Sequence, residues 1–92
     1  MDRLDNYRKE IDDIDKEIVN LFEKRMETVL KVAKYKKENK MEVFQSSRED
    51  IVLNKAISNL RDKKYTDGVI ELFNLLMELS KNLQKNEIKE EL

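Results

Sequence analysis

The stretch LDNYRKEIDDIDKEIVNLFEKRMETVLKVAKYKKE, residues 4–38, decides the fold because its apolar residues recur at alternating intervals of three and four. This spacing lines one face of a helix. The first six positions form what we call the apolar seam: Leu4, Tyr7, Ile11, Ile14, Ile18 and Leu21. The same spacing continues, without Gly or Pro, through Arg25, Thr28, Val32 and Tyr35. The pattern predicts one helix from about Asp2 to about Glu38.

A helix of this length is too long for a small domain to cover. It would extend roughly 55 Å at 1.5 Å per residue, whereas a compact chain of 92 residues has a radius of gyration of only about 12 Å. The remaining residues cannot bury its whole apolar face. We therefore expect a second copy of the chain to cover it in a homodimer built on this helix.

The rest of the chain predicts two shorter helices after the polar turn ENKMEVFQSS, residues 38–47. One is expected from about residue 47 to 62 and the other from about residue 66 to 86, each with apolar residues at helical spacing. Residues 87–92 are expected to fray. The predicted fold class is all-α, with one domain over residues 1–92 and three helices per chain.

Composition excludes several classes of function. The chain has 19 Lys and Arg residues against 20 Asp and Glu residues, which argues against a general nucleic-acid binder. It has no Cys and no His, so it lacks disulfides, thiol nucleophiles and the commonest zinc ligand. No apolar run approaches the length of a membrane span or a signal peptide, and we expect a cytoplasmic protein without a membrane partner.

Three cations on the first helix do not fit a plain amphipathic pattern. Arg25 occupies a position of the stripe where an apolar residue is expected, and a cation there is costly unless paired. Lys36 follows eleven residues later, at about 16 Å along nearly the same face, so the two side chains could bracket a small dianion. Arg8 lies about 25 Å down the helix from Arg25 and can join that site only from another copy of the chain. The structural alternative is that Arg25 extends to solvent or pairs with a Glu of a neighbouring helix.

Two further groups of polar residues could bind a ligand. Ser80 and Gln84 are an i, i+4 pair at the edge of an apolar face, where they either bind a ligand or face solvent. The segment QSSRED, residues 45–50, resembles a capping box in which Ser46 or Ser47 caps the second helix. Arg48 and Glu49 then occupy its first turn, which can be both a cap and a binding edge.

The segments YRKEIDDIDKEIVNLFEKR (7–25), KVAKYKK (31–37), SSRE (46–49) and ELSKNLQ (78–84), in this order, resemble the helical chorismate mutase domain of bacteria. The resemblance covers about Arg8 to Gln84. It implies an intertwined all-α homodimer with two sites, each completed by the partner subunit. The implied reaction rearranges chorismate to prephenate, on the route to phenylalanine and tyrosine, without a nucleophile, metal or cofactor.

The resemblance also implies roles for individual residues. Arg25 and Arg8 of the partner subunit would bind the two carboxylates of chorismate, with Ser80 assisting. Lys36 and Gln84 would donate to the ether oxygen, where negative charge grows in the transition state.

The second helix would hold the ring hydroxyl. Glu49 would accept a hydrogen bond from it, and Arg48 would line the pocket or hold Glu49. Gln45 stands where relatives often have an Asp that shares this contact, so we expect a weakened or rearranged contact. Phe44 stands where relatives often have a polar or basic residue.

Two alternatives remain beside a chorismate mutase. The same fold can support elimination of pyruvate from isochorismate. A non-catalytic helical dimerisation module would use Arg25 to specify register, but it would not need the other polar positions. Because the chain ends soon after the third helix, we expect a stand-alone enzyme rather than one fused to a dehydratase or dehydrogenase.

Overall fold

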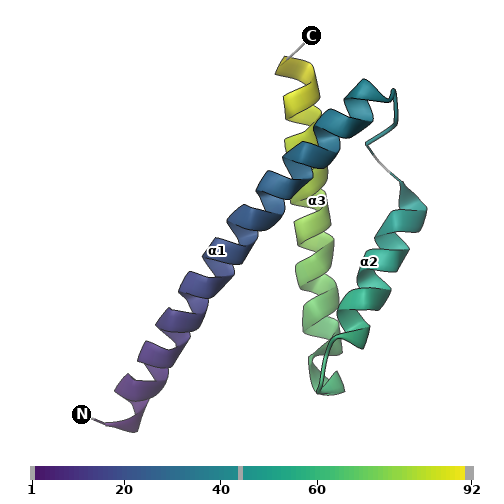
Figure 1. The fold of residues 1–92 in the computed structure, drawn as a ribbon. Helices are drawn as coiled ribbons and strands as arrows, with labels where there is room; N and C mark the ends of the chain where they lie inside the picture. The colour runs from purple at the N-terminus through teal and green to yellow at the C-terminus, as the bar shows by residue number, and fades with distance from the viewer. Residues whose placement is uncertain (1, 44, 91–92) are drawn as a thin grey trace.

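The computed structural model describes residues 2–43 and 45–90, and every regular element within this part of the chain is helical. In chain order the elements are α1 (Arg3–Glu38), α2 (Ser46–Ser58), the short 3-10 helix η1 (Lys63–Tyr65) and α3 (Thr66–Glu90) (Figure 1). The prediction of an all-α chain with one long and two shorter helices is confirmed.

A side-chain hydrogen bond to the backbone marks each end of helix α1. The Asp2 carboxylate accepts a hydrogen bond from the backbone N–H of Asp5 at 2.9 Å, so Asp2 is the N-cap and Arg3 the first helical residue. At the other end the Asn39 side chain donates to the Tyr35 carbonyl at 2.8 Å. Lys40 then adopts a left-handed backbone (φ 55°), which turns the chain away from the helix.

Helix α2 starts differently from the prediction. We expected Ser46 or Ser47 to cap it, but the N-cap is Gln45 and no side chain provides the capping hydrogen bond. The Gln45 carbonyl accepts from the N–H groups of Arg48 (3.0 Å) and Glu49 (3.3 Å). The capping-box prediction was therefore wrong, because the extended backbone ends one residue before the first serine.

Helix α2 also ends at Ser58, before the expected limit near Asp62. The Lys63 ammonium donates to the carbonyls of Ile57 (2.7 Å) and Leu60 (3.3 Å), satisfying acceptors that a longer helix would use internally. The Asp62 side chain then caps η1. A lysine beyond the helix therefore satisfies carbonyls at and just after its end.

Helix α3 continues to Glu90, past the expected end near residue 86. Residues 87–90 contain neither Gly nor Pro, so the sequence offers no signal to stop the helix there. Residues 91–92, part of the tail expected to fray, lie outside the described residues. Phe44, expected at the rim of the pocket, also lies outside them.

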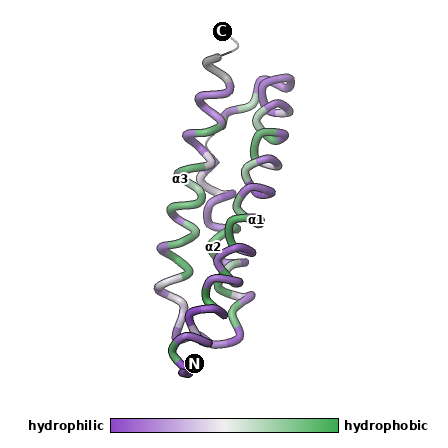
Figure 2. The backbone as a smooth tube through the Cα atoms, turned by 90° about the vertical axis from the view of Figure 1, so that its left-hand side faces the viewer, coloured by the Kyte–Doolittle hydropathy of each residue, from purple (hydrophilic) through white to green (hydrophobic). Residues whose placement is uncertain are grey.

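Packing is confined to one part of the long helix. Helix α3 packs against both α1 and α2, and the N-terminal half of α1 projects away from them (Figure 1). The apolar residues that the described chain buries are Ala33, Ala56 and Met77. The six residues of the apolar seam are instead 52–62% exposed. Figure 2 shows hydrophobic segments recurring along α1 and α3.

The chain is consequently more extended than a compact domain of its size. Its radius of gyration is 16.7 Å, against about 12 Å for a compact chain of this length. Its accessible surface is 7898 Å², roughly 2,200 Å² more than a folded monomer of this mass presents. None of the described helices has an apolar stretch long enough to cross a membrane.

Candidate active site

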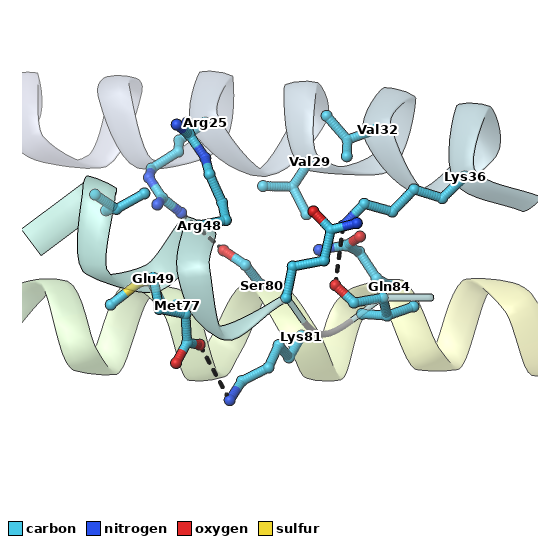
Figure 3. A pocket seen from close by; sticks show the side chains of 13 residues that line it. Arg25, Val29, Val32, Lys36, Arg48, Glu49, Met77, Ser80, Lys81 and Gln84 are labelled. Atoms are coloured by element: carbon cyan, nitrogen blue, oxygen red, sulfur yellow. Dashed lines mark hydrogen bonds and ion pairs between the residues drawn. The ribbon is translucent and has the colours of Figure 1, made fainter. Parts of the chain in front are cut away.

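A cavity of about 170 Å³ lies among the three helices (Figure 3). Seven of the eight predicted site residues line it: Arg25, Lys36, Gln45, Arg48, Glu49, Ser80 and Gln84. The apolar part of its wall comes from Val29, Val32, Val43, Val52 and Met77. Residues far apart in the sequence therefore meet around one small space.

Arg25 and Ser80 join α1 to α3 at this cavity. Arg25 Nη1 donates a hydrogen bond to Ser80 Oγ at 2.7 Å, and Ser80 is buried. Ser80 Oγ in turn donates to the Leu76 carbonyl at 2.6 Å. A hydroxyl has a single proton, so Ser80 acts on Arg25 as an acceptor and orients the guanidinium. Arg25 is thus half-buried and held in place, not extended into solvent as the structural alternative would have it.

The charges around the cavity favour an anionic ligand. Burial, and after it the nearby Arg48 guanidinium, lower the pKa of Arg25. The lining has four cations (Arg25, Lys36, Arg48 and Lys81) and one carboxylate, Glu49. This excess of positive charge would repel a metal ion, and residues 2–43 and 45–90 contain no cluster of three side chains able to bind one. A dianion would relieve the repulsion between the two guanidinium groups.

Lys36 reaches the cavity from the last turn of α1. Its ammonium donates to the Val43 carbonyl at 2.9 Å, which ties the end of α1 to the segment that leads into α2. An ammonium group has three protons. Lys36 can therefore keep this hydrogen bond and still donate to a molecule in the cavity.

Gln84 is a buried amide whose hydrogen bonding is incomplete. The residue is 7% exposed, and its Oε1 has no partner among the described residues. Buried polar atoms are nearly always paired, because leaving one unpaired costs about 1–3 kcal/mol. Gln84 Oε1 is accordingly an acceptor available to a ligand, and the Nε2 group of the same amide is the part that can donate.

Glu49 is held by a residue that the sequence did not single out. Its Oε2 lies 3.2 Å from Lys81 Nζ on α3, and both side chains are about 30% exposed (Figure 3). We expected Arg48 to line the pocket or hold Glu49; Arg48 lines the cavity, and Lys81 makes this ion pair. Gln45 is exposed at the edge of the cavity, at the N-terminus of α2.

Arg8 is the one predicted site residue that the single chain does not bring to the cavity. It is exposed on the projecting half of α1, and its seventeen-residue separation from Arg25 corresponds to about 25 Å along the helix. This distance exceeds the reach of an arginine side chain.

Comparison with known proteins assigns the family. A family model described as chorismate mutase type II matches residues 7–85. The chain belongs to the chorismate mutase type II family. The matched region includes α2 and most of α1 and α3, and all eight predicted site residues lie within it.

Two similar proteins are larger than this chain. A bifunctional chorismate mutase/prephenate dehydratase of Buchnera aphidicola subsp. Schizaphis graminum is 39% identical over 82 residues, which cover 87% of this chain and 21% of that protein. The protein of the same name from Buchnera aphidicola subsp. Acyrthosiphon pisum is 37% identical over 86 residues, covering 90% of this chain and 22% of the relative. The chain thus spans about a fifth of the length of these curated relatives. No solved structure gives a significant match.

The family assignment confirms the resemblance drawn from the sequence motifs. For this member of the chorismate mutase type II family, sequence reasoning missed Lys81 among the charged cavity residues. The available signal was its position directly after Ser80. On a helix that offset turns a side chain by about 100°, toward a different neighbouring helix.

Proposed function

We propose that the chain is a chorismate mutase that converts chorismate to prephenate within a homodimer. The observation that carries this proposal is the cation-rich cavity, whose wall combines Arg25, Arg48 and Lys36 with the buried amide of Gln84. Chorismate is a small dicarboxylate, and a cavity lined by cations favours such a dianion.

The reaction is unimolecular and requires no nucleophile from the protein. Within one molecule the ether C–O bond breaks while a new C–C bond forms, and no atom is gained or lost. The enzyme has to hold the flexible substrate in its reactive, chair-like conformation and stabilise the charge that develops on the ether oxygen. Cations and amides on rigid helices suffice for both tasks.

Arg25 binds one substrate carboxylate in this mechanism. Ser80 orients Arg25 by accepting a hydrogen bond from Nη1 and donating its own proton to the Leu76 carbonyl. The second carboxylate is bound by Arg8 of the partner subunit, because Arg8 of the same chain lies too far along α1. One of the two carboxylate-binding arginines thus comes from the second copy.

Lys36 and Gln84 act on the ether oxygen. The Lys36 ammonium and the Gln84 amide donate hydrogen bonds that strengthen as negative charge grows on that oxygen. Interactions that are stronger in the transition state than in the bound substrate raise kcat. Holding Lys36 through the Val43 carbonyl reduces the reorganisation needed when the substrate reacts.

Glu49 accepts a hydrogen bond from the ring hydroxyl. Gln45 lies at the cavity edge, where its neutral amide gives that hydroxyl a weaker contact than a carboxylate would.

The exposed apolar seam supports the homodimer. Two copies that each bury an excess of roughly 2,200 Å² would form an interface within the range of obligate dimers, about 2,000–5,000 Å² in total. A continuous row of exposed apolar side chains such as the seam marks an interaction surface. The same association would bring the projecting half of α1, with Arg8, to the other copy's cavity.

The direct test measures the disappearance of chorismate by absorbance with purified protein, alongside the molecular mass in solution by light scattering. We expect a dimer that turns over chorismate far above the uncatalysed rate. A folded dimer with only the background rate would instead support the non-catalytic module. Pyruvate release from isochorismate, measured with the same preparation, distinguishes the lyase alternative.

A further inference from the structure

Two consecutive residues of α3 connect it to two different helices. Ser80 faces α1, where it accepts from Arg25, and Lys81 faces α2, where it pairs with Glu49. The rotation of about 100° per residue explains how neighbours in the chain reach different helices. The sequence Ser80-Lys81 therefore organises both the carboxylate-binding side of the cavity and the side that bears Glu49.

The Lys81–Glu49 pair is placed to have more effect than an ordinary surface ion pair. The two side chains are 31% and 30% exposed, so both charges are partly removed from water. Fully exposed pairs contribute little, because solvent screens them and two flexible side chains must be ordered. Partial burial against the cavity wall reduces the solvent screening of the pair and restricts the two side chains.

Glu49 is the one carboxylate among the described residues that line the cavity. Its Oε2 is 3.2 Å from Lys81 Nζ, which leaves Oε1 as the acceptor for a substrate hydroxyl. A glutamate side chain without an anchor would sample several rotamers. An anchored carboxylate presents its free oxygen in one direction.

We propose that Lys81 is a positioning residue, which holds Glu49 so that the carboxylate accepts a hydrogen bond from the hydroxyl group of the substrate. This inference rests on the proposed function and assigns Lys81 a role through Glu49, not through direct contact with the reacting atoms. It also accounts for a fourth cation at a cavity whose ligand is a dianion, because Lys81 is matched to Glu49 and not to the substrate.

The test is a double-mutant cycle with steady-state kinetics on the full chain. Lys81→Met keeps the apolar stem and removes the charge. We expect it to lower kcat/KM about tenfold, mainly through KM, because the hydroxyl contact is made in both the bound substrate and the transition state. In a Glu49→Gln background the same substitution should have little further effect, since the group that Lys81 holds has lost its charge.

Two variants supply the controls. Lys85→Met removes an exposed lysine one turn along the same helix and should leave the kinetics unchanged. Lys81→Arg keeps a cation within reach of Glu49 and should restore most of kcat/KM. Circular dichroism checks that each variant is folded, and if Lys81→Met is not, Lys81→Gln takes its place in the cycle.

The outcomes separate this inference from the proposed function. An inactive wild-type protein overturns both. If the wild type is active but Lys81→Met has the same effect in the wild-type and Glu49→Gln backgrounds, only the role of Lys81 is overturned. Faster turnover by Lys81→Met would also overturn it, since Lys81 would then withhold Glu49 from the substrate.

Discussion

Arg25 Nη1 lies 2.7 Å from Ser80 Oγ, and this hydrogen bond joins two residues that are 55 positions apart in the chain. It connects the middle of α1 to α3 at the wall of the cavity. Burial and the neighbouring Arg48 lower the pKa of Arg25, so the guanidinium is held in surroundings that disfavour its charged form. Such an arrangement favours ligand binding over folding stability, because an entering anion relieves the unfavourable charge.

Replacing Ser80 by Ala tests whether substrate binding by Arg25 depends on the hydrogen bond that Ser80 accepts from it. The variant removes the hydrogen bond from Nη1, so the guanidinium gains rotamer freedom that substrate binding must then remove. We expect kcat/KM to fall roughly tenfold, which corresponds to the loss of one hydrogen bond to a charged group. Steady-state kinetics give the value.

The matched control for Ser80 is Ser58→Ala. Ser58 Oγ also donates to a carbonyl within its own helix, that of Lys55 at 2.9 Å, but it is exposed and lies outside the cavity. Wild-type kinetics are expected for Ser58→Ala. Equal effects of the two substitutions would show that Ser80 acts only through the stability of its helix.

Replacing Lys36 by Ala tests the assignment to the ether oxygen. Removing a donor that acts mainly in the transition state should lower kcat by at least about 10²-fold, as with the loss of an oxyanion donor. KM should change less than kcat. Lys34→Ala, which removes an exposed lysine of the same helix, should be neutral. A kcat close to that of wild type in Lys36→Ala would refute the assigned role.

The sequence predicted the long helix because the apolar seam has a strict spacing. Arg25 stood out because it occupies the next position of that spacing, and Lys36 because it lies on nearly the same face; the family resemblance supplied the roles of the other cavity residues. Local chemistry was less predictable. Ser46 and Ser47 are good caps, yet Gln45 occupies the N-cap position. At the end of α2 the Ile57 carbonyl accepts from Lys63, six residues further along the chain, and the pairing of Lys81 depends on how two helices are rotated against each other. Periodicity within one helix does not contain that information.

Subunit mixing tests whether Arg8 acts in the other subunit's site. Arg8→Ala and Lys36→Ala should each be nearly inactive alone. In a heterodimer of the two variants, one site would combine an intact Arg8 with an intact Lys36, and the other site would lack both. Equal amounts unfolded and refolded together should regain about a quarter of wild-type activity, because half the dimers are mixed and each has one intact site of two.

Two outcomes would contradict a shared site. If Arg8 served its own chain's cavity, mixing would restore nothing, since each chain would carry one defect. Full activity of Arg8→Ala alone would show that Arg8 binds no substrate. Co-refolded Arg8→Ala with itself serves as the baseline.

Replacing Gln45 by Asp separates the two tasks of this position, because Gln45 is both the N-cap of α2 and part of the cavity wall. Its side chain makes no capping hydrogen bond, whereas Asp and Asn are among the best N-caps. Both Gln45→Asp and Gln45→Asn should therefore raise the free energy of unfolding by about 0.5–1 kcal/mol, measured by urea denaturation. Only Asp also brings a charged acceptor to the substrate hydroxyl, so only Gln45→Asp should lower KM, by roughly threefold and without a change in kcat. Equal KM values for the Asp and Asn variants would place the hydroxyl out of reach of residue 45 and leave it to Glu49.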